Sequence, residues 1–253
     1  VKGLREKKYK GKETKEFLSD VVKMTEGEAY EYLLGEVVFC DALIDLSLRP
    51  MIPRPETEHW VKEAVKQIVD VRCNILDKNE NDTPHRAFHV LDLFSGSGCV
   101  GLAVAKHFPQ AEVDLIEYGP KLKEQIEISI KKNKFDSSRV HAITGDTWTG
   151  AEGEYDYIFV VPPYVPREMK DEVMQELHAE DPLSFFDKED GYYYHKQVLG
   201  RAKEFLASDG TLYLEFDITQ REQIEQLAQH YGYQHYSFLK DPYGHEYVIA
   251  ITK

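Results

Sequence analysis

The sequence has few cysteines, and their arrangement argues against two classes of small protein. Cys40, Cys73 and Cys99 are the only cysteines in 253 residues, and no two form a C-x-x-C pair. A disulfide scaffold or a structural zinc site is therefore not expected, and a reducing compartment is the default. Histidine is commoner, at 10 residues, but without H-E-x-x-H or paired spacing, so we expect no metal site.

Long apolar runs and an excess of positive charge are also missing. No stretch reaches the roughly 18 residues that a membrane-spanning helix needs, so we expect no membrane contact. Lys and Arg number 31 against 45 Asp and Glu, which gives a net charge of −14. This balance disfavours binding along a nucleic-acid backbone and favours a protein or small-molecule partner. Because the chain begins at Val1 and not at Met, we expect that a native start and any targeting segment are missing from it.

The remaining composition is that of a globular protein, with 42% hydrophobic and 30% charged residues. Sparse apolar residues at helical spacing predict a small helical piece over residues 1–34. Residues 35–86 are expected to hold a short strand pair, a stiff proline-rich turn, a helix beginning near Glu56 and a polar linker from Asp70 to Arg86. A main α/β domain is expected over residues 87–253.

From Phe88 onward, short apolar strands alternate with amphipathic helices. This alternation predicts a mostly parallel sheet covered on both faces. The last two strands have no helix between them, so we expect a hairpin with one antiparallel strand. The expected strands are FHVLDL, EVDLIE, VHAIT, YDYIFV, TLYLEF, YQHYSFL and EYVIAIT. The expected helices cover residues 100–108, 120–134, 194–206 and 220–230.

The segment VLDLFSGSGCVG leads from the first of these strands into a helix. Gly96 and Gly98 allow a ligand to approach the backbone, and the helix offers unpaired N–H groups. With Gly101 they also match G-x-G-x-x-G, the dinucleotide fingerprint, although a tight turn without ligand fits the same letters. Asp92, inside the strand, suits a ligand that carries a cationic amino-acid part.

Two further polar groups follow the next strands. Glu117 ends the second strand, where an acid can accept hydrogen bonds from two ribose hydroxyls; a helix-capping acid is the alternative. Asp146, in GDTW after the third strand, could accept from an adenine amino group. Trp148 in the same loop could stack on the adenine ring or simply pack against the protein.

The fourth strand ends in VVPPYVP. Pro162 and Pro163 hold the backbone rigidly and remove two donors, which leaves nearby carbonyl oxygens available as acceptors. Tyr164 adds an aromatic wall. The alternative is that this segment is only a structural turn and binds no substrate.

The chain resembles the HemK/PrmC family in a series of segments that occur in the same order. They are IPRPETE (52–58), LDLFSGSG, Glu117, GDTW, PPYVP, DPL (181–183), EDG (189–191) and LEFDITQ (214–220). These enzymes use S-adenosylmethionine to methylate the glutamine in the GGQ loop of class I peptide-chain release factors. The resemblance covers roughly residues 32–253. It implies a class I methyltransferase fold, a Rossmann-like sheet of seven strands, with a small N-terminal helical piece for substrate recognition and a β-hairpin linker.

The resemblance also implies roles for individual residues and a partner. Pro162, Pro163 and Tyr164, with position 161, would hold the substrate amide. The partner would be a release factor that acts in translation termination. The methyltransferase itself would be a monomer and would not contact nucleic acid directly. The residues implied in S-adenosylmethionine binding are Asp92, Phe94, Ser95, Gly96, Ser97, Gly98, Glu117, Asp146, Thr147 and Trp148.

Two positions depart from the family pattern. Phe94 stands where the loop normally begins with glycine, and Val161 stands where the N-P-P-Y motif has asparagine. An asparagine oxygen would accept from the substrate amide and orient its nitrogen; valine has no acceptor. We expect the loss of one such oriented bond to reduce the rate by about 10²–10³, so the chain should bind the cofactor but transfer methyl slowly or not at all.

Three other interpretations remain open at this point. The chain could be a non-catalytic, cofactor-binding module that docks a partner, which Val161 favours. It could be a ribosomal-protein glutamine methyltransferase, or, from the glycine fingerprint alone, a nicotinamide oxidoreductase. The short N-terminal piece and the polar insertion before Phe88 suggest an organellar member of the family, and hence the mitochondrial matrix, with the cytoplasm as the alternative.

Overall fold

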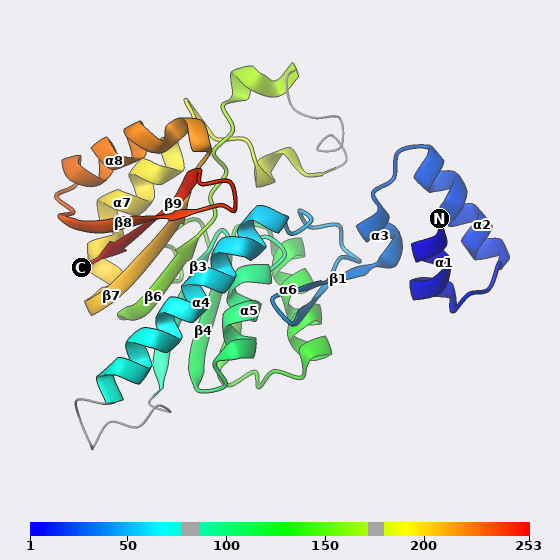
Figure 1. Ribbon diagram of the computed structural model, residues 1–253, viewed down its shortest axis with the longest axis horizontal. Coiled ribbons are helices and arrows are strands. Elements are labelled where there is room, and N and C mark those ends of the chain that lie inside the picture. Colours follow the sequence, from blue (N-terminus) through cyan, green and yellow to red (C-terminus); the bar gives the residue numbers. More distant parts are fainter. Residues whose placement is uncertain (77–86, 172–179) are drawn as a thin grey trace.

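A seven-stranded sheet forms the centre of the molecule (Figure 1). The computed structural model describes residues 1–76, 87–171 and 180–253. The strands lie in the order β5-β4-β3-β6-β7-β9-β8, and β9 runs antiparallel to both of its neighbours. Their bounds are β3 (Phe88–Leu93), β4 (Ala111–Glu117), β5 (Val140–Thr144), β6 (Tyr155–Val160), β7 (Leu206–Glu215), β8 (His235–Lys240) and β9 (Glu246–Thr252). The expected seven strands, the class I methyltransferase arrangement and the final hairpin are confirmed.

Helices cover both faces of the sheet because side chains alternate along each strand. Val90 of β3 joins a core with α4, α5 and α6, whereas its neighbour Leu91 joins a core with α7 and α8. Each buried strand therefore reads as a nearly continuous apolar run, as expected of a parallel sheet with two covered faces. The helices are α4 (Pro55–Leu76), α5 (Cys99–His107), α6 (Pro120–Asn133), α7 (Tyr193–Phe205) and α8 (Arg221–His230), with single turns η1 (Arg167–Asp171), η3 (Pro182–Ser184) and η4 (Ile218–Gln220).

The linker expected from Asp70 is wrong in its first part, because α4 continues to Leu76. The polar composition of this segment suggested a break, yet no proline or glycine interrupts the helix before residue 77. Arg72 lies over the Phe88 ring at 4.1 Å, which ties the last turns of the helix to β3. Trp60 of α4 is fully buried and stacks on Phe159 of the sheet. The remainder of the expected linker lies outside the described residues.

The N-terminal helices form a small unit to one side of the sheet (Figure 1). They are α1 (Lys2–Tyr9), α2 (Lys15–Thr25) and α3 (Tyr30–Leu34), which share a core of Leu4, Phe17 and Leu33. A hairpin of β1 (Glu36–Phe39) and β2 (Ala42–Asp45) follows and contacts α6. The expected helical piece and strand pair are confirmed.

Asp45 anchors this hairpin to α6. Its carboxylate accepts from the Gln125 side chain at 2.8 Å and pairs with Lys132 at 2.6 Å, while the Asp45 backbone N–H donates to Ser129. Burial by itself would raise the pKa of Asp45, but these donors and Ser47 outweigh it and hold the pKa at about 2. The charged form is therefore the stable form in the folded protein.

We predict that Asp45→Asn lowers the free energy of unfolding by about 2 kcal/mol at neutral pH. The folded pKa lies below the unfolded value of 3.8, so this stabilisation is complete above about pH 4 and is lost as the pH falls toward 2. Urea unfolding at several pH values measures the difference between the two proteins. Asp41→Asn, at the exposed hairpin turn, is the control and should change little. A deficit for Asp45→Asn that is as large at pH 2 as at pH 7 would contradict the prediction.

Candidate active site

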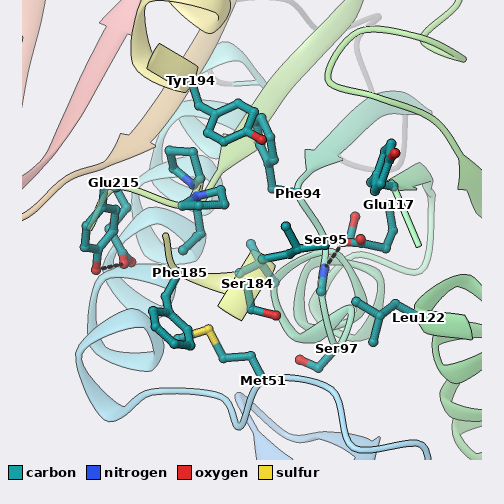
Figure 2. Close-up of a pocket in the computed structure, with 18 of the residues that line it drawn as sticks. Met51, Phe94, Ser95, Ser97, Glu117, Leu122, Ser184, Phe185, Tyr194 and Glu215 are labelled. Carbon is teal, nitrogen blue, oxygen red and sulfur yellow. Dashed lines mark hydrogen bonds between the residues drawn. The ribbon is translucent and has the colours of Figure 1, made fainter. Parts of the chain in front are cut away.

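The loops that follow β3 and β6 meet at the point where the direction of strand order reverses. From β3 the chain continues outward through β4 and β5, then returns to the other side of β3 with β6. In open α/β sheets, ligands bind at this switch point, beyond the carboxyl ends of the strands. A cavity of about 760 Å³ lies here (Figure 2).

Most of the residues singled out from the sequence line this single cavity. They are Asp92, Phe94, Ser95, Gly96, Ser97, Glu117, Asp146, Thr147, Val161, Pro162, Pro163 and Tyr164. The cavity thus joins the glycine-containing loop after β3 to the diproline corner after β6. Gly98 and Trp148 are not among its lining residues.

The loop after β3 is held open by backbone geometry. Gly96 and Gly98 have φ of +54° and +79°, the left-handed region that glycine adopts without a steric penalty. A Cβ at Gly98 would come within 3.1 Å of Ile126, so this glycine allows the loop to lie close to α6. The Ser95 hydroxyl lies at hydrogen-bond distance from the carbonyls of Asp92 and Ile116 and ties the loop to β3 and β4.

Asp92 is buried at the end of β3 and faces the cavity. Its Oδ2 accepts from the Gly101 N–H at 2.8 Å, which fixes the carboxyl against the first turn of α5. Burial raises the pKa of Asp92 to about 7; the Gly101 N–H lowers it in part, and the nearby charge of Glu117 adds to the increase. A cationic group placed in the cavity would therefore be attracted to this carboxyl and would favour its charged form.

Glu117 stands at the end of β4 with both carboxyl oxygens aligned by the backbone. Oε2 accepts from the Gly96 N–H at 2.8 Å and Oε1 accepts from the Gly119 N–H at 3.1 Å (Figure 2). Burial raises the pKa of Glu117, although these N–H donors counteract it. Each oxygen has a second acceptor direction available, which suits a pair of hydroxyls such as those of a ribose.

Of the residues expected to contact adenine in the loop after β5, only some line the cavity. Asp146 and Thr147 line the cavity, with Thr147 in the left-handed region at φ +53°. The expectation that Trp148 stacks on the adenine is wrong. Its indole lies parallel to the Phe205 ring at 4.6 Å and donates to the Gln197 carbonyl, so the alternative of simple packing is correct. An amphipathic ring after a strand fits an apolar core as well as a ligand, and the sequence alone could not separate the two.

A buried carboxylate holds the diproline corner in place. Oε1 of Glu215, at the end of β7, accepts from the Tyr164 hydroxyl at 3.2 Å (Figure 2). Its Oε2 accepts from Thr57 at 2.9 Å and from the Trp60 indole at 2.5 Å. Burial raises the pKa of Glu215, and these three donors favour its charged form. Glu215 thus connects the acceptor corner to the start of α4.

The carbonyl side of the corner is fixed by a second set of contacts. Gln220 donates to the carbonyls of Tyr164 and Gly191 at 3.3 and 3.1 Å. His195 is fully buried, with Nδ1 3.2 Å from the Gly191 carbonyl and Nε2 3.0 Å from the Glu215 carbonyl. Burial lowers the pKa of His195 to about 4, while both carbonyls act in the opposite direction. The EDG and LEFDITQ segments therefore support the corner.

The IPRPETE segment closes the cavity from a third side. Arg54 pairs with Glu180 at 2.5 Å, and Glu180 also accepts from the Ile52 N–H. Sequence reasoning assigned no role to Glu180, whereas only 2% of its side chain is exposed. It also assigned no role to Glu215, although an acid that ends an apolar strand is the same signal that indicated Glu117. Glu176 and His178 lie outside the described residues.

The residues present fit S-adenosylmethionine, the cofactor that the resemblance implies. The cavity volume suits a nucleoside with an amino-acid tail. Asp92 suits the cationic amino-acid part, Glu117 suits the ribose hydroxyls, and Asp146 and Thr147 line the remaining polar wall. Within residues 1–76, 87–171 and 180–253, no cluster of three metal-ligating side chains occurs, and no helix is long and apolar enough to cross a membrane.

We predict that Glu117→Gln weakens S-adenosylmethionine binding about ten-fold, because an amide accepts less strongly than a charged carboxylate. Isothermal titration calorimetry measures the dissociation constant directly. Glu112→Gln is the matched control, since Glu112 lies exposed in the same strand, away from the cavity. Equal affinity in all three proteins would exclude a ribose role for Glu117.

Comparison with known proteins agrees with this geometry. Residues 65–184 match the family model of the methyltransferase small domain. The chain is 26% identical to a release factor glutamine methyltransferase of Streptococcus pneumoniae, covering 94% of this chain and 80% of that protein. It is 29% identical to one from Coxiella burnetii, covering 88% and 75%. These relatives support the resemblance to the HemK/PrmC family.

Solved structures extend the likeness to the fold. A 16S rRNA methyltransferase of T. thermophilus, in complex with AdoMet and guanosine, has a TM-score of 0.56 at 16% identity, covering 86% of this chain and 49% of that one. A methyltransferase from Pyrococcus furiosus has a TM-score of 0.51 at 19% identity, covering 73% and 82%. The sheet order, the switch-point cavity and these comparisons lead to one conclusion: the chain has the class I methyltransferase fold, with a cavity whose lining fits S-adenosylmethionine.

Proposed function

We propose that this chain is a member of the HemK/PrmC family that methylates the side-chain amide nitrogen of the glutamine in the GGQ loop of a class I release factor. The observation that carries the proposal is the cavity that joins the cofactor loop after β3 to the rigid Pro162–Pro163 corner after β6. The near full-length similarity to release factor glutamine methyltransferases supports it.

Positioning is the main task of such a site. An amide nitrogen is a poor nucleophile because its lone pair is delocalised into the carbonyl, so the protein has to orient it. The carbonyl oxygens of Val161 and Pro162 accept no hydrogen bond from any described residue, and proline nitrogens offer no competing donor. One of these oxygens can therefore accept from a substrate N–H, while Tyr164, held by Glu215, forms the side wall.

S-adenosylmethionine would supply a methyl group on a positively charged sulfur. As the N–C bond forms and the S–C bond breaks, the sulfur would leave as a neutral thioether and the amide nitrogen would release one proton. The chain's residues contribute orientation and electrostatics and no strong base. Two hydrogen-bond acceptors on the protein would fix both N–H bonds of the amide and direct its lone pair toward the methyl group. This chain provides one such acceptor from the corner backbone.

Val161 removes the second acceptor. The side chain is half-buried, lines the cavity and packs against the main core. It fills about the same space as asparagine but cannot accept a hydrogen bond. We therefore propose that the chain binds cofactor and release factor normally and transfers methyl slowly. Its monomeric state, the absence of nucleic-acid contact and the mitochondrial location stay predictions.

The second candidate is a non-catalytic, cofactor-binding module, and Val161 is the observation that favours it. The two candidates differ in how the chain responds when the acceptor is restored. A slow enzyme should recover its rate, because the rest of the site is in place. A binding module that has lost its function elsewhere should stay inactive.

We predict that Val161→Asn raises methyl transfer to a release factor by about 10²–10³. The measurement is transfer of radioactive methyl from S-adenosylmethionine to purified release factor, with mass spectrometry to locate the modified residue. Cofactor affinity should change little, since position 161 belongs to the acceptor side.

Val161→Ala serves as the control, because it changes the side chain without adding an acceptor and should bring no gain. A release factor with alanine in place of the GGQ glutamine should remain unmodified by every variant. Fast and equal turnover by the natural chain and Val161→Asn would overturn our account of position 161. No transfer by either would favour the binding module.

A further inference from the structure

Phe94 and Val161 directly follow the paired ends of β3 and β6, and their side chains pack against the cores on opposite faces of the sheet. Leu93 of β3 and Val160 of β6 are paired in register, and the next residue on each strand is Phe94 or Val161. Both side chains line the cavity. A methyl group that moves from a cofactor on the β3 loop to an acceptor at the β6 corner must pass this junction. Phe94 therefore lies next to the reacting end of the cavity.

The backbone at Phe94 is unusual for such a large residue. Its φ is +58°, in the left-handed region that is unfavourable for a bulky side chain. A glycine would adopt this conformation without that cost. Strain of this kind persists where the surroundings hold the residue in place, and it clusters at functional sites.

Tyr194, near the start of α7, holds the Phe94 ring. The two ring centres lie 5.0 Å apart with planes at 70°, an edge-to-face contact at one wall of the cavity (Figure 2). Tyr194 already has a cation nearby, because the Lys188 ammonium lies 5.1 Å from its ring centre. Phe94 thus presents an oriented aromatic ring to the cavity beside a tyrosine whose ring is already in contact with a cation.

We propose that Phe94 selects the charged cofactor over its neutral product. An aromatic ring attracts a cation through its quadrupole, and S-adenosylmethionine carries its positive sulfur at the reacting end, whereas S-adenosylhomocysteine has an uncharged sulfur there. Phe94 holds the cofactor before transfer and loses this attraction once the methyl has left, which favours release of the product. The proposal rests on the cofactor and not on the identity of the acceptor.

The charged side chains in the cavity are the same in the natural protein and in the Phe94 variants. Asp92 and Glu117 also attract a cation, and Lys188 repels one, but all three remain when only Phe94 is changed. A substitution of the ring therefore isolates its contribution.

The experiment is calorimetric titration of S-adenosylmethionine and of S-adenosylhomocysteine, without any acceptor protein. Phe94→Leu keeps apolar bulk and removes the ring. It should weaken S-adenosylmethionine about five-fold and leave S-adenosylhomocysteine within about two-fold. Phe94→Tyr keeps the ring and should retain the preference. Phe94→Gly relieves the backbone and should lose the preference as Phe94→Leu does, so a folding defect in the leucine variant alone does not decide the test.

Phe185→Leu is the matched control. Phe185 is another buried phenylalanine that lines the same cavity, and its loss should leave the ratio of the two dissociation constants unchanged. Equal weakening of both ligands in Phe94→Leu and Phe94→Gly would overturn the proposal, as would unchanged affinities. A similar change of ratio in Phe185→Leu would overturn it too. Because no acceptor is present, a failure of the proposed methyl acceptor leaves this result unaffected.

Discussion

The buried carboxylate of Glu215 is the interaction on which the acceptor side of the site depends. It lies where β7 ends and receives hydrogen bonds from Tyr164 of the diproline corner and from Thr57 and Trp60 of α4. A buried charge is tolerated only when it is well paired, so these donors and the carboxylate hold one another in place. Removing any one of them would leave a polar group unsatisfied in the core. The corner is therefore a fixed wall, which is what orienting a weak amide nucleophile requires.

The two ends of the cavity differ in chemistry. The cofactor side carries Asp92 and Glu117, both aligned by backbone N–H groups. The junction between the β3 loop and the diproline corner carries the apolar side chains of Phe94 and Val161. Both residues follow the paired ends of β3 and β6 and add apolar surface to the lining of the cavity.

Much of the fold followed from local patterns. Alternation of apolar strands with amphipathic helices predicts a parallel sheet, and acids or glycines directly after strands predict where ligands bind. The same reasoning failed where one residue suits two environments. Trp148 packs on Phe205 although its loop position fits a ligand-stacking ring, and α4 continues past the polar residues that suggested a linker. Composition describes a segment's own preference, whereas these outcomes depend on which neighbours the fold brings to it.

Sequence order alone decided the framework: which segments are strands, that they run parallel, and that the residues after the first, second and fourth strands belong to one edge of the sheet. Periodicity and steric rules carry this information locally. Only the tertiary structure decided how distant segments complete the site. Glu215 and Thr57 are 158 residues apart and Gln220 and Tyr164 are 56 apart, yet each pair meets at the corner. Such contacts depend on strand order and packing, and no local pattern in the chain encodes them.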